Sequence, residues 1–514
     1  MARRVRELIP AALAALLLAT LVLAPLGAVA LRAGGFGLLT PRDLDALWFT
    51  LWQAAVSAAI SCAFAIPLAR ALHRRDFRGR GLLISLMGAP FILPTIAAVM
   101  GLIAVFGRKG LVNTGLGWLG LPEVSIYGAH GVIAAHVFFN LPLATRMVLH
   151  GWRAIPTERV RLAASLGFGP AQMRRHLETP MLRAVLPGAF LAIFLVCLTS
   201  FAIALTLGGG PKATTVELAI YQAFRFDFDM GRAATLALVQ VALCVGALMV
   251  TARMTLPSGF GAGLDRPQPM PEGVTPASPL PDAAMIVLAA AFLLVPIGAI
   301  VLRGLPALAD LPPSIWRAAG TSLAVAAGST ILTLALALPL ALTATRHRWA
   351  ELSAMLPLSA SALVMGAGAF LIARAFVNPT SLAIPVTLLT NAVLSVPFAV
   401  RILIPAAQYL QHNYDRLASA LDLRGVARLR YLTLPRLAQP LGFSAGLAAA
   451  FSMGDLGVIT LFSDGRTQTL PLALFQLMGA YRMDQAAAAA VLLIALSFAL
   501  FWALDRIGHH ADPR

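Results

Sequence analysis

Few residues in this chain have the type and spacing of a catalytic or metal-binding site. The cysteines Cys62, Cys197 and Cys244 lie in apolar stretches, without a CxxC pair or a neighbouring histidine. We therefore expect them to be packing residues rather than metal ligands or disulfide partners. The run GGGPKAT at 208–214 resembles a phosphate-binding loop, but Pro211 precedes its lysine, and GxxxxGK followed by Ser or Thr does not occur. The sequence predicts no catalytic residue, no metal site and no cofactor held by this chain.

The residues best suited to bind a ligand are carboxylates and tyrosines. Asp455 lies within an apolar stretch, where a carboxylate is costly and usually faces a cavity or a partner. A role in a translocation pathway and a buried structural hydrogen bond both remain open for it. Glu217, Tyr221, Asp227 and Tyr481 could contact a cation, because carboxylates and aromatic faces attract positive charge. The alternative for Glu217 and Asp227 is a solvated outer face.

A polar segment in this apolar chain occurs twice, as RLAASLGFGPAQMRRHLETP at 161–180 and as RLASALDLRGVARLRYLTLP at 416–435. Read as helix, it is amphipathic but too polar to span a membrane. Gly167 and the Gly-Pro pair at 169–170 should break it into two short helices, and Pro180 should begin the next membrane helix. We call each copy an elbow and expect it to transmit movement from a cytoplasmic partner. Two copies of equal length argue against a merely basic loop.

Long apolar stretches must position these polar residues. The mean hydropathy is +0.82 and 12% of residues are charged, which excludes an ordinary soluble protein. Runs of about 20 apolar residues can cross a bilayer, so the predicted fold is an all-α integral membrane protein with about twelve transmembrane helices in two tandem six-helix repeats. The expected spans are 8–31, 48–70, 82–106, 128–148, 184–207, 232–252, 283–302, 319–345, 352–376, 383–404, 437–461 and 485–505. The first could be a signal peptide, but its apolar run exceeds the usual core of roughly 7–15 residues, and we expect it to be retained.

The net charge of +17 could indicate nucleic-acid binding. In a multispanning protein, however, lysine and arginine collect in cytoplasmic loops. With the N-terminus inside, most of the 39 basic residues fall on the cytoplasmic side, including clusters at 74–80, 174–175 and 424–430. The sequence therefore predicts that the chain contacts membrane lipid and does not bind nucleic acid. It also predicts that both termini lie in the cytoplasm.

A proline-rich segment at 255–282 divides the chain into similar halves, and we expect it to be an irregular cytoplasmic linker. NLPLATR at 140–146 matches SVPFAVR at 395–401, and ordered matches of this kind indicate duplication. His136 and Asn391 occupy equivalent positions, where interhelical hydrogen bonds are expected. The predicted division is a first repeat at 1–254 with an extra N-terminal span at 8–31 and a core at 45–254, the linker at 255–282, and a second repeat at 283–514.

The elbows resemble the EAA loop of ABC-importer permeases, which has a Glu-Ala-Ala start, a glycine six residues after the glutamate and a terminal proline. The spacing agrees in both copies. The chemistry departs from the pattern, because arginine replaces the acidic residue twice and aspartate replaces the glycine of the second copy. The elbow residues that the resemblance implies are Arg161, Ala163, Leu166, Gly167 and Pro180 in the first copy and Arg416, Ala418, Leu421, Asp422 and Pro435 in the second.

This resemblance covers about residues 45–505 and implies a type I importer permease with both permease units fused in one chain. In that family the elbow docks in a groove of a separate ATPase subunit. The resemblance therefore implies two copies of an ATPase that binds ATP and Mg, a periplasmic substrate-binding protein, and a location in the bacterial inner membrane. The chain itself would not be an enzyme, and transport would proceed by alternating access.

Within the importers, residues 205–234 and 451–462 resemble thiamine permeases, and the second stretch is shared with iron(III) permeases. The resemblance implies that thiamine, and with it thiamine phosphates, is the small-molecule substrate. Val216, Ile220 and Phe224 recur at helical spacing, which predicts a helix that dips toward the pore. The alternatives are an iron(III), polyamine or sulfate importer permease, or a proton-coupled secondary transporter, which would need buried charge pairs but not matched elbows.

Overall fold

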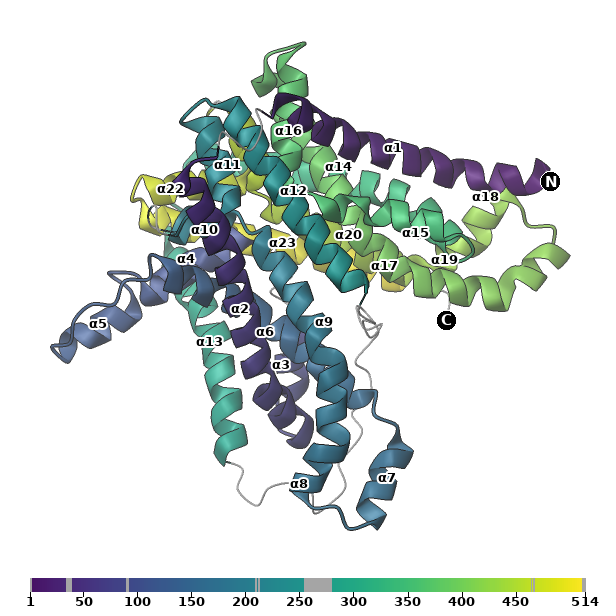
Figure 1. The fold of residues 1–514 in the computed structure, drawn as a ribbon, viewed down its shortest axis with the longest axis horizontal. Coiled ribbons are helices and arrows are strands. Elements are labelled where there is room, and N and C mark those ends of the chain that lie inside the picture. The colour runs from purple at the N-terminus through teal and green to yellow at the C-terminus, as the bar shows by residue number, and fades with distance from the viewer. Residues whose placement is uncertain are drawn as a thin grey trace.

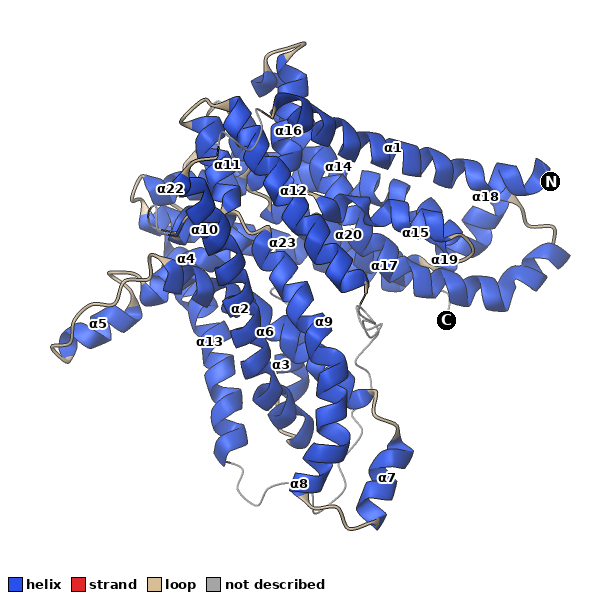
Figure 2. Ribbon diagram, in the orientation of Figure 1, coloured by secondary structure: helices blue, strands red, loops and turns tan. Residues whose placement is uncertain are grey.

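The computed structural model describes residues 2–33, 39–88, 92–208, 210, 213–253, 280–463, 465 and 467–510. Within these ranges the secondary structure is helical and no strand occurs (Figure 2). Eleven of the described helices are long and apolar enough to cross a membrane, or twelve if the bent pair Arg348–Ser359 and Ala362–Arg374 is one span. The structure therefore confirms the predicted all-α integral membrane fold. Most of the predicted linker, 254–279, lies outside the described residues.

The helices fall into two series that repeat in order. The first series is α1 (Ala2–Arg32), α2 (Pro41–Arg74), α3 (Arg80–Leu86), α4 (Thr95–Phe106), α5 (Leu111–Trp118), α6 (Ala129–Arg153), α7 (Thr157–Ser165), α8 (Pro170–Met173), α9 (Thr179–Leu198), α10 (Ala202–Leu207), α11 (Val216–Arg225) and α12 (Met230–Ala252). The second is α13 (Leu280–Gly304), α14 (Pro313–Ala344), α15 (Arg348–Met355), α16 (Ala362–Arg374), α17 (Ala383–Ala420), α18 (Gly425–Arg428), α19 (Leu434–Arg436), α20 (Ala438–Gly454), α21 (Gly457–Phe462), α22 (Leu470–Gly479) and α23 (Met483–His510). We call α2–α12 the first half and α14–α23 the second half.

Matching hydrogen bonds show that the two halves fold alike. The hydroxyl of Thr50 on α2 accepts a bond of 2.8 Å from the N–H of Val216 at the start of α11. In the second half the hydroxyl of Ser322 on α14 accepts a bond of 2.8 Å from the N–H of Leu470 at the start of α22. A short helix is thus fixed at its first residue by the same long helix in each half.

The first helix of each series packs across the molecule onto the opposite half. Helix α1 contacts α14 and α16, and α13 contacts α2 and α4. Glycine makes both contacts close: a Cβ atom on Gly368 would lie 2.3 Å from the carbonyl oxygen of Pro25, and one on Gly101 would lie 2.8 Å from that of Pro296. Small residues let membrane helices approach in this way. The halves are therefore joined by exchanged helices as well as by the chain between them.

The molecule has the shape of two arms that meet at one end (Figure 1). One arm contains α2, α6, α9 and α13 and carries the first elbow at its tip. The other contains α1, α14, α17 and α20 and carries the second elbow. Helices α4, α10, α11, α16 and α22 gather where the arms meet, which we call the vertex. The elbows are thus far apart, and the short helices lie at the opposite end of the molecule.

Four predicted spans contain breaks, although the one at 437–461 agrees with Ala438–Phe462, which is long and apolar enough to cross a membrane as one span. The span at 82–106 divides into α3 and α4, since Pro94 lacks a backbone donor and precedes the first residue of α4. The span at 352–376 bends by 85° before α16. The spans at 184–207 and 437–461 are interrupted before α10 and α21. Helix ends at such breaks expose backbone groups that a continuous helix would cover.

Candidate functional site: the elbows and the vertex

Both elbows contain the same backbone turn. In the first, Gly167 has φ +66° and the N–H of Phe168 donates to the carbonyl of Ala163 at 3.0 Å. In the second, Asp422 has φ +49° and the N–H of Leu423 donates to the carbonyl of Ala418 at 2.9 Å. Aspartate tolerates the left-handed region better than most residues. The replacement of glycine by Asp422 therefore leaves the chain path unchanged.

The elbow residues divide into a packed side and an open side. Ala163 and Ala418 are buried, whereas Leu166 and Leu421 are each 62% exposed. Arg161 and Arg416, at the predicted EAA start, are also exposed. An alanine on the inner side keeps the turn compact, and a leucine on the outer side leaves apolar area uncovered in both copies. Pro180 occupies the first turn of α9, as predicted, and Pro435 lies in the short helix α19 just before α20.

The two elbows are anchored to their arms by different ion pairs. In the first half Nε of Arg70 on α2 donates to Oε1 of the buried Glu178 at 2.8 Å. In the second half Asp415 on α17 is shared by Arg346 and Arg428. Each elbow also joins its membrane helix through a π-helical turn, Arg174–Glu178 or Leu429–Thr433. The same turn is thus held in place by different charges.

At the vertex, the first turn of α16 lies beside two carboxylates from opposite halves, the buried Glu217 and the partly buried Asp455. Ser361 caps this helix, its hydroxyl accepting from the N–H of Val364 at 3.2 Å. Glu217 on α11 lies beside the Ser361 hydroxyl and is fully buried. Asp455, which follows α20, accepts a bond of 3.1 Å from the N–H of Gly457 through Oδ1. A Cβ on Gly457 would lie 3.5 Å from Cβ of Ala362, which brings this segment against the same turn.

Three carboxylate oxygens of this pair are unsatisfied. Among the described residues, neither oxygen of Glu217 and not Oδ2 of Asp455 has a hydrogen-bond partner. Helix α11 is too short to span a membrane, and burial raises the pKa of its Glu217 carboxyl to about 8, with the Ser361 hydroxyl lowering it in part. Buried carboxylates without partners are rare in folded proteins. The solvated face considered for Glu217 is thus excluded.

An aromatic cluster closes the vertex on the side of α11 that faces α16. The ring of Phe224 on α11 lies 4.6 Å from that of Phe370 on α16, at 83°, and Phe370 lies 5.3 Å from Phe462 on α21, at 65°. One residue further along, Nη2 of Arg225 donates to the carbonyl of Ser463 at 3.2 Å. The first of these ring contacts and the hydrogen bond join the two halves directly.

The other predicted pathway residues lie elsewhere. Tyr221 packs edge-on against Phe201 and Phe226. Asp227 is half exposed and pairs with Arg232 at 3.0 Å, which supports the start of α12. Tyr481 is 86% exposed. The structure thus brings Glu217 and Asp455 together, but not Asp227 or Tyr481 with them.

Sequence reasoning missed Ser361, Phe370 and Phe462. Ser361 and Phe370 meet the first half only through folding, and Phe462 packs on Phe370, so no local pattern marked them. Phe224 had a usable signal, because it lies seven residues after Glu217 and therefore on the same face of a helix.

The equivalent buried polar residues of the two halves, Asn391 and His136, only partly follow the prediction. Nδ2 of Asn391 donates to Oγ of Ser452 at 3.1 Å, which confirms an interhelical bond. At the equivalent position His136 is buried, and in the described ranges neither ring nitrogen has a partner, so the prediction is wrong for this residue. Across the described residues no three His, Cys, Asp or Glu side chains are grouped to hold a metal ion.

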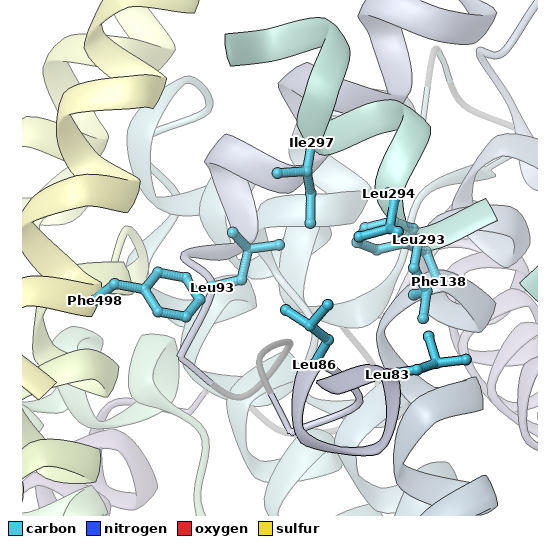
Figure 3. Close-up of a pocket in the computed structure, with 8 residues that line it drawn as sticks. All are labelled: Leu83, Leu86, Leu93, Phe138, Leu293, Leu294, Ile297 and Phe498. Carbon is cyan, nitrogen blue, oxygen red and sulfur yellow. The ribbon is translucent and has the colours of Figure 1, made fainter. Parts of the chain in front are cut away.

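A small cavity between the halves is too apolar to be the substrate site. It lies beside α13 and α23 and is lined only by leucine, isoleucine and phenylalanine side chains (Figure 3). Its lining residues are Leu83, Leu86, Leu93, Phe138, Leu293, Leu294, Ile297 and Phe498. A site for a polar substrate needs a few polar groups that fix its orientation, and none of these lining side chains carries one.

Two matched elbows on a two-armed bundle of membrane helices define a fused, two-fold transport permease. No family model matches the chain, but curated relatives do. The chain is 40% identical to the thiamine transport system permease protein ThiP of Brucella abortus, over 96% of this chain and 94% of the relative. It is 37% identical to ThiP of Salmonella typhimurium, over 98% and 97%. A probable sulfate transport system permease protein of a Helicosporidium species is 26% identical, over 41% and 77%. The chain belongs to the family of thiamine transport system permease proteins.

Proposed function

We propose that this chain is the permease subunit of a thiamine importer of the ABC class and forms the pathway for thiamine and thiamine phosphates. The single observation that carries the proposal is identity of 37–40% to thiamine transport permeases over nearly the whole length of both chains. The relative named as a sulfate permease covers less than half of this chain. Thiamine is an aromatic cation, and the carboxylates and rings at the vertex suit a ligand of that kind.

Each elbow docks a separate ATPase subunit, so two copies bind one permease and carry the ATP and Mg. The exposed Leu166 and Leu421 support this role, because apolar side chains uncovered at the same point of a repeated turn suit a partner's groove. The elbows and both termini lie in the cytoplasm, and the protein sits in the bacterial inner membrane. A periplasmic binding protein delivers the substrate at the vertex.

The pathway opens by a change in the angle between the arms. In this structure the elbows are apart (Figure 1), while the ring contact between Phe224 and Phe370 closes the vertex; we take this as a state closed toward the periplasm. Closure of the ATPase dimer would draw the elbows together and separate α11 from α16, thereby opening the vertex. Hydrolysis by the ATPase then returns the arms to the present state.

Uptake of labelled thiamine tests the proposal. A strain that lacks its own thiamine transporter is complemented with this chain, its ATPase and its binding protein. We expect saturable uptake that needs all three. Absence of uptake with all three present in the membrane fraction would refute thiamine as the substrate, and uptake without the ATPase would refute the transport class.

A further inference from the structure

We propose that Glu217, Asp455 and the rings of Phe224, Phe370 and Phe462 form one recognition site for a flat aromatic cation, shared between the two halves and closed in this structure. The inference rests on the proposed function and deepens it, since it names the groups that select the substrate within the permease.

The carboxylates provide the preference for positive charge. Glu217 and Asp455 come from opposite halves and lie at the same helix end, and three of their four oxygens have no partner in the described structure. A buried acceptor without a partner destabilises the protein, so its presence indicates that the partner arrives in another state. When the halves separate, a cation takes the place of the proton that Glu217 holds in the closed structure and satisfies both carboxylates.

The rings provide the preference for a flat ligand. Stacking an aromatic ring between two others requires about 7 Å between them, two contacts of about 3.5 Å each. The centroids of Phe224 and Phe370 are only 4.6 Å apart, so no ligand ring fits now. Because these rings belong to different halves, a separation of the arms by about 2.4 Å, the difference between these two distances, would make the space. The same rings then close behind the ligand when the arms return.

The charge and the rings are ordered along one helix pair. Glu217, near the start of α11, lies beside Ser361 at the start of α16, and Phe224, near the end of α11, lies beside Phe370 further along α16. Helices α11 and α16 are in contact, and these two pairings show that they run in the same direction. A ligand entering at the vertex would meet the rings first and the carboxylates second.

The site is asymmetric although the fold is repeated. Pro471 stands at the position in α22 that matches Glu217 in α11, and Ser200 matches Asp455. A two-fold site would accept two equivalent cations, whereas this one has a single set of charges. That arrangement suits one ligand with a charged end and an uncharged end.

Charge selectivity in the reconstituted transporter tests the inference. The full complex with ATPase and binding protein is placed in liposomes, and uptake is measured for thiamine and for an isostere whose thiazolium ring is a neutral thiophene, each at saturation. We expect Glu217→Gln to lower the thiamine rate about tenfold or more, as for one charged contact, with the isostere unaffected. Phe370→Leu should slow both compounds, and Phe370→Tyr should restore them. Asp310→Asn, an exposed carboxylate outside the site, is the matched control.

The outcomes separate the two proposals. Basal ATP hydrolysis and co-purification of the ATPase show that each variant is folded. A wild-type complex that moves neither compound overturns the proposed function. A wild-type complex that moves thiamine, together with a Glu217→Gln variant that keeps the wild-type ratio of rates, overturns the site alone. Equal uptake rates for Phe370→Leu and wild type would show that the rings are not part of the recognition site.

Discussion

Replacing Gly368 with alanine should loosen the contact between α1 and the second half. The new Cβ would lie 2.3 Å from the carbonyl oxygen of Pro25, whereas carbon and oxygen normally approach no closer than about 3.3 Å. The helices must therefore move apart by about 1 Å or bend. The contact atom belongs to the backbone of a helix and cannot rotate away, so we expect a loss of about 1–3 kcal/mol in the free energy of unfolding, the range for overpacked interiors.

Gly320 on α14 provides the matched control. A Cβ there meets nothing within 4 Å, and glycine inside a helix is about 1 kcal/mol less favourable than alanine. Gly320→Ala should therefore hold or raise stability, while Gly368→Ala lowers it. The measurement is thermal unfolding of the purified complex in detergent, with cysteine cross-linking between α1 and α16 as a direct report on the contact. Equal stability of the two variants, with unchanged cross-linking, would refute the exchanged-helix packing.

Three further predictions concern the elbows and the vertex. Leu166→Asp and Leu421→Asp should each reduce co-purification of the ATPase far more than the matching alanine variants, because they place a charge in the docking groove; equal recovery would contradict the docking role. Asp422→Gly should keep transport and raise stability by up to about 1 kcal/mol, since glycine adopts the φ of +49° without strain; loss of ATPase binding would show that the aspartate itself makes contact. Glu217 binds a proton in the folded state up to a pKa of about 8, against an ordinary 4.5, so stability should fall as the pH rises from 4.5 toward 8. Glu217→Gln should remove that fall in thermal unfolding scans between pH 5 and 9, and an unchanged profile would contradict it.

The sequence predicted those parts of the fold that local chemistry determines. The length of the apolar stretches predicted the membrane helices. Gly167 predicted the turn within the first elbow, and Pro180 predicted the start of the helix that follows it. The prediction treated Asp422 as a departure, although the backbone there repeats that of Gly167, because sequence alone does not show which residue takes positive φ. The prediction also treated 82–106 as one span, because the hydropathy of a stretch does not show where its helix is interrupted.

The site was harder to predict because its parts come from distant segments. The sequence marks both Asp455 and Glu217 as candidate pathway residues, but it does not indicate that the two lie beside the same turn of α16. Glu217 and Phe370 are more than 150 residues apart in sequence, and α11 lies against α16 only because the two halves pack together at the vertex. Side chains in such an interface follow no period, so periodicity cannot reveal them.

The packing of α1 onto α14 and α16 has a consequence for the order in which the protein is made. During synthesis α1 enters the membrane first, but its partners at 313–374 emerge only after some 300 further residues. Until then the contact between the carbonyl of Pro25 and Gly368 cannot form, and α1 lacks its packing against the second half. The last docking step therefore joins the earliest segment to one of the latest. Truncation before α16 would leave α1 without its principal partner in the bilayer, exposed to quality-control proteases that recognise unassembled membrane helices.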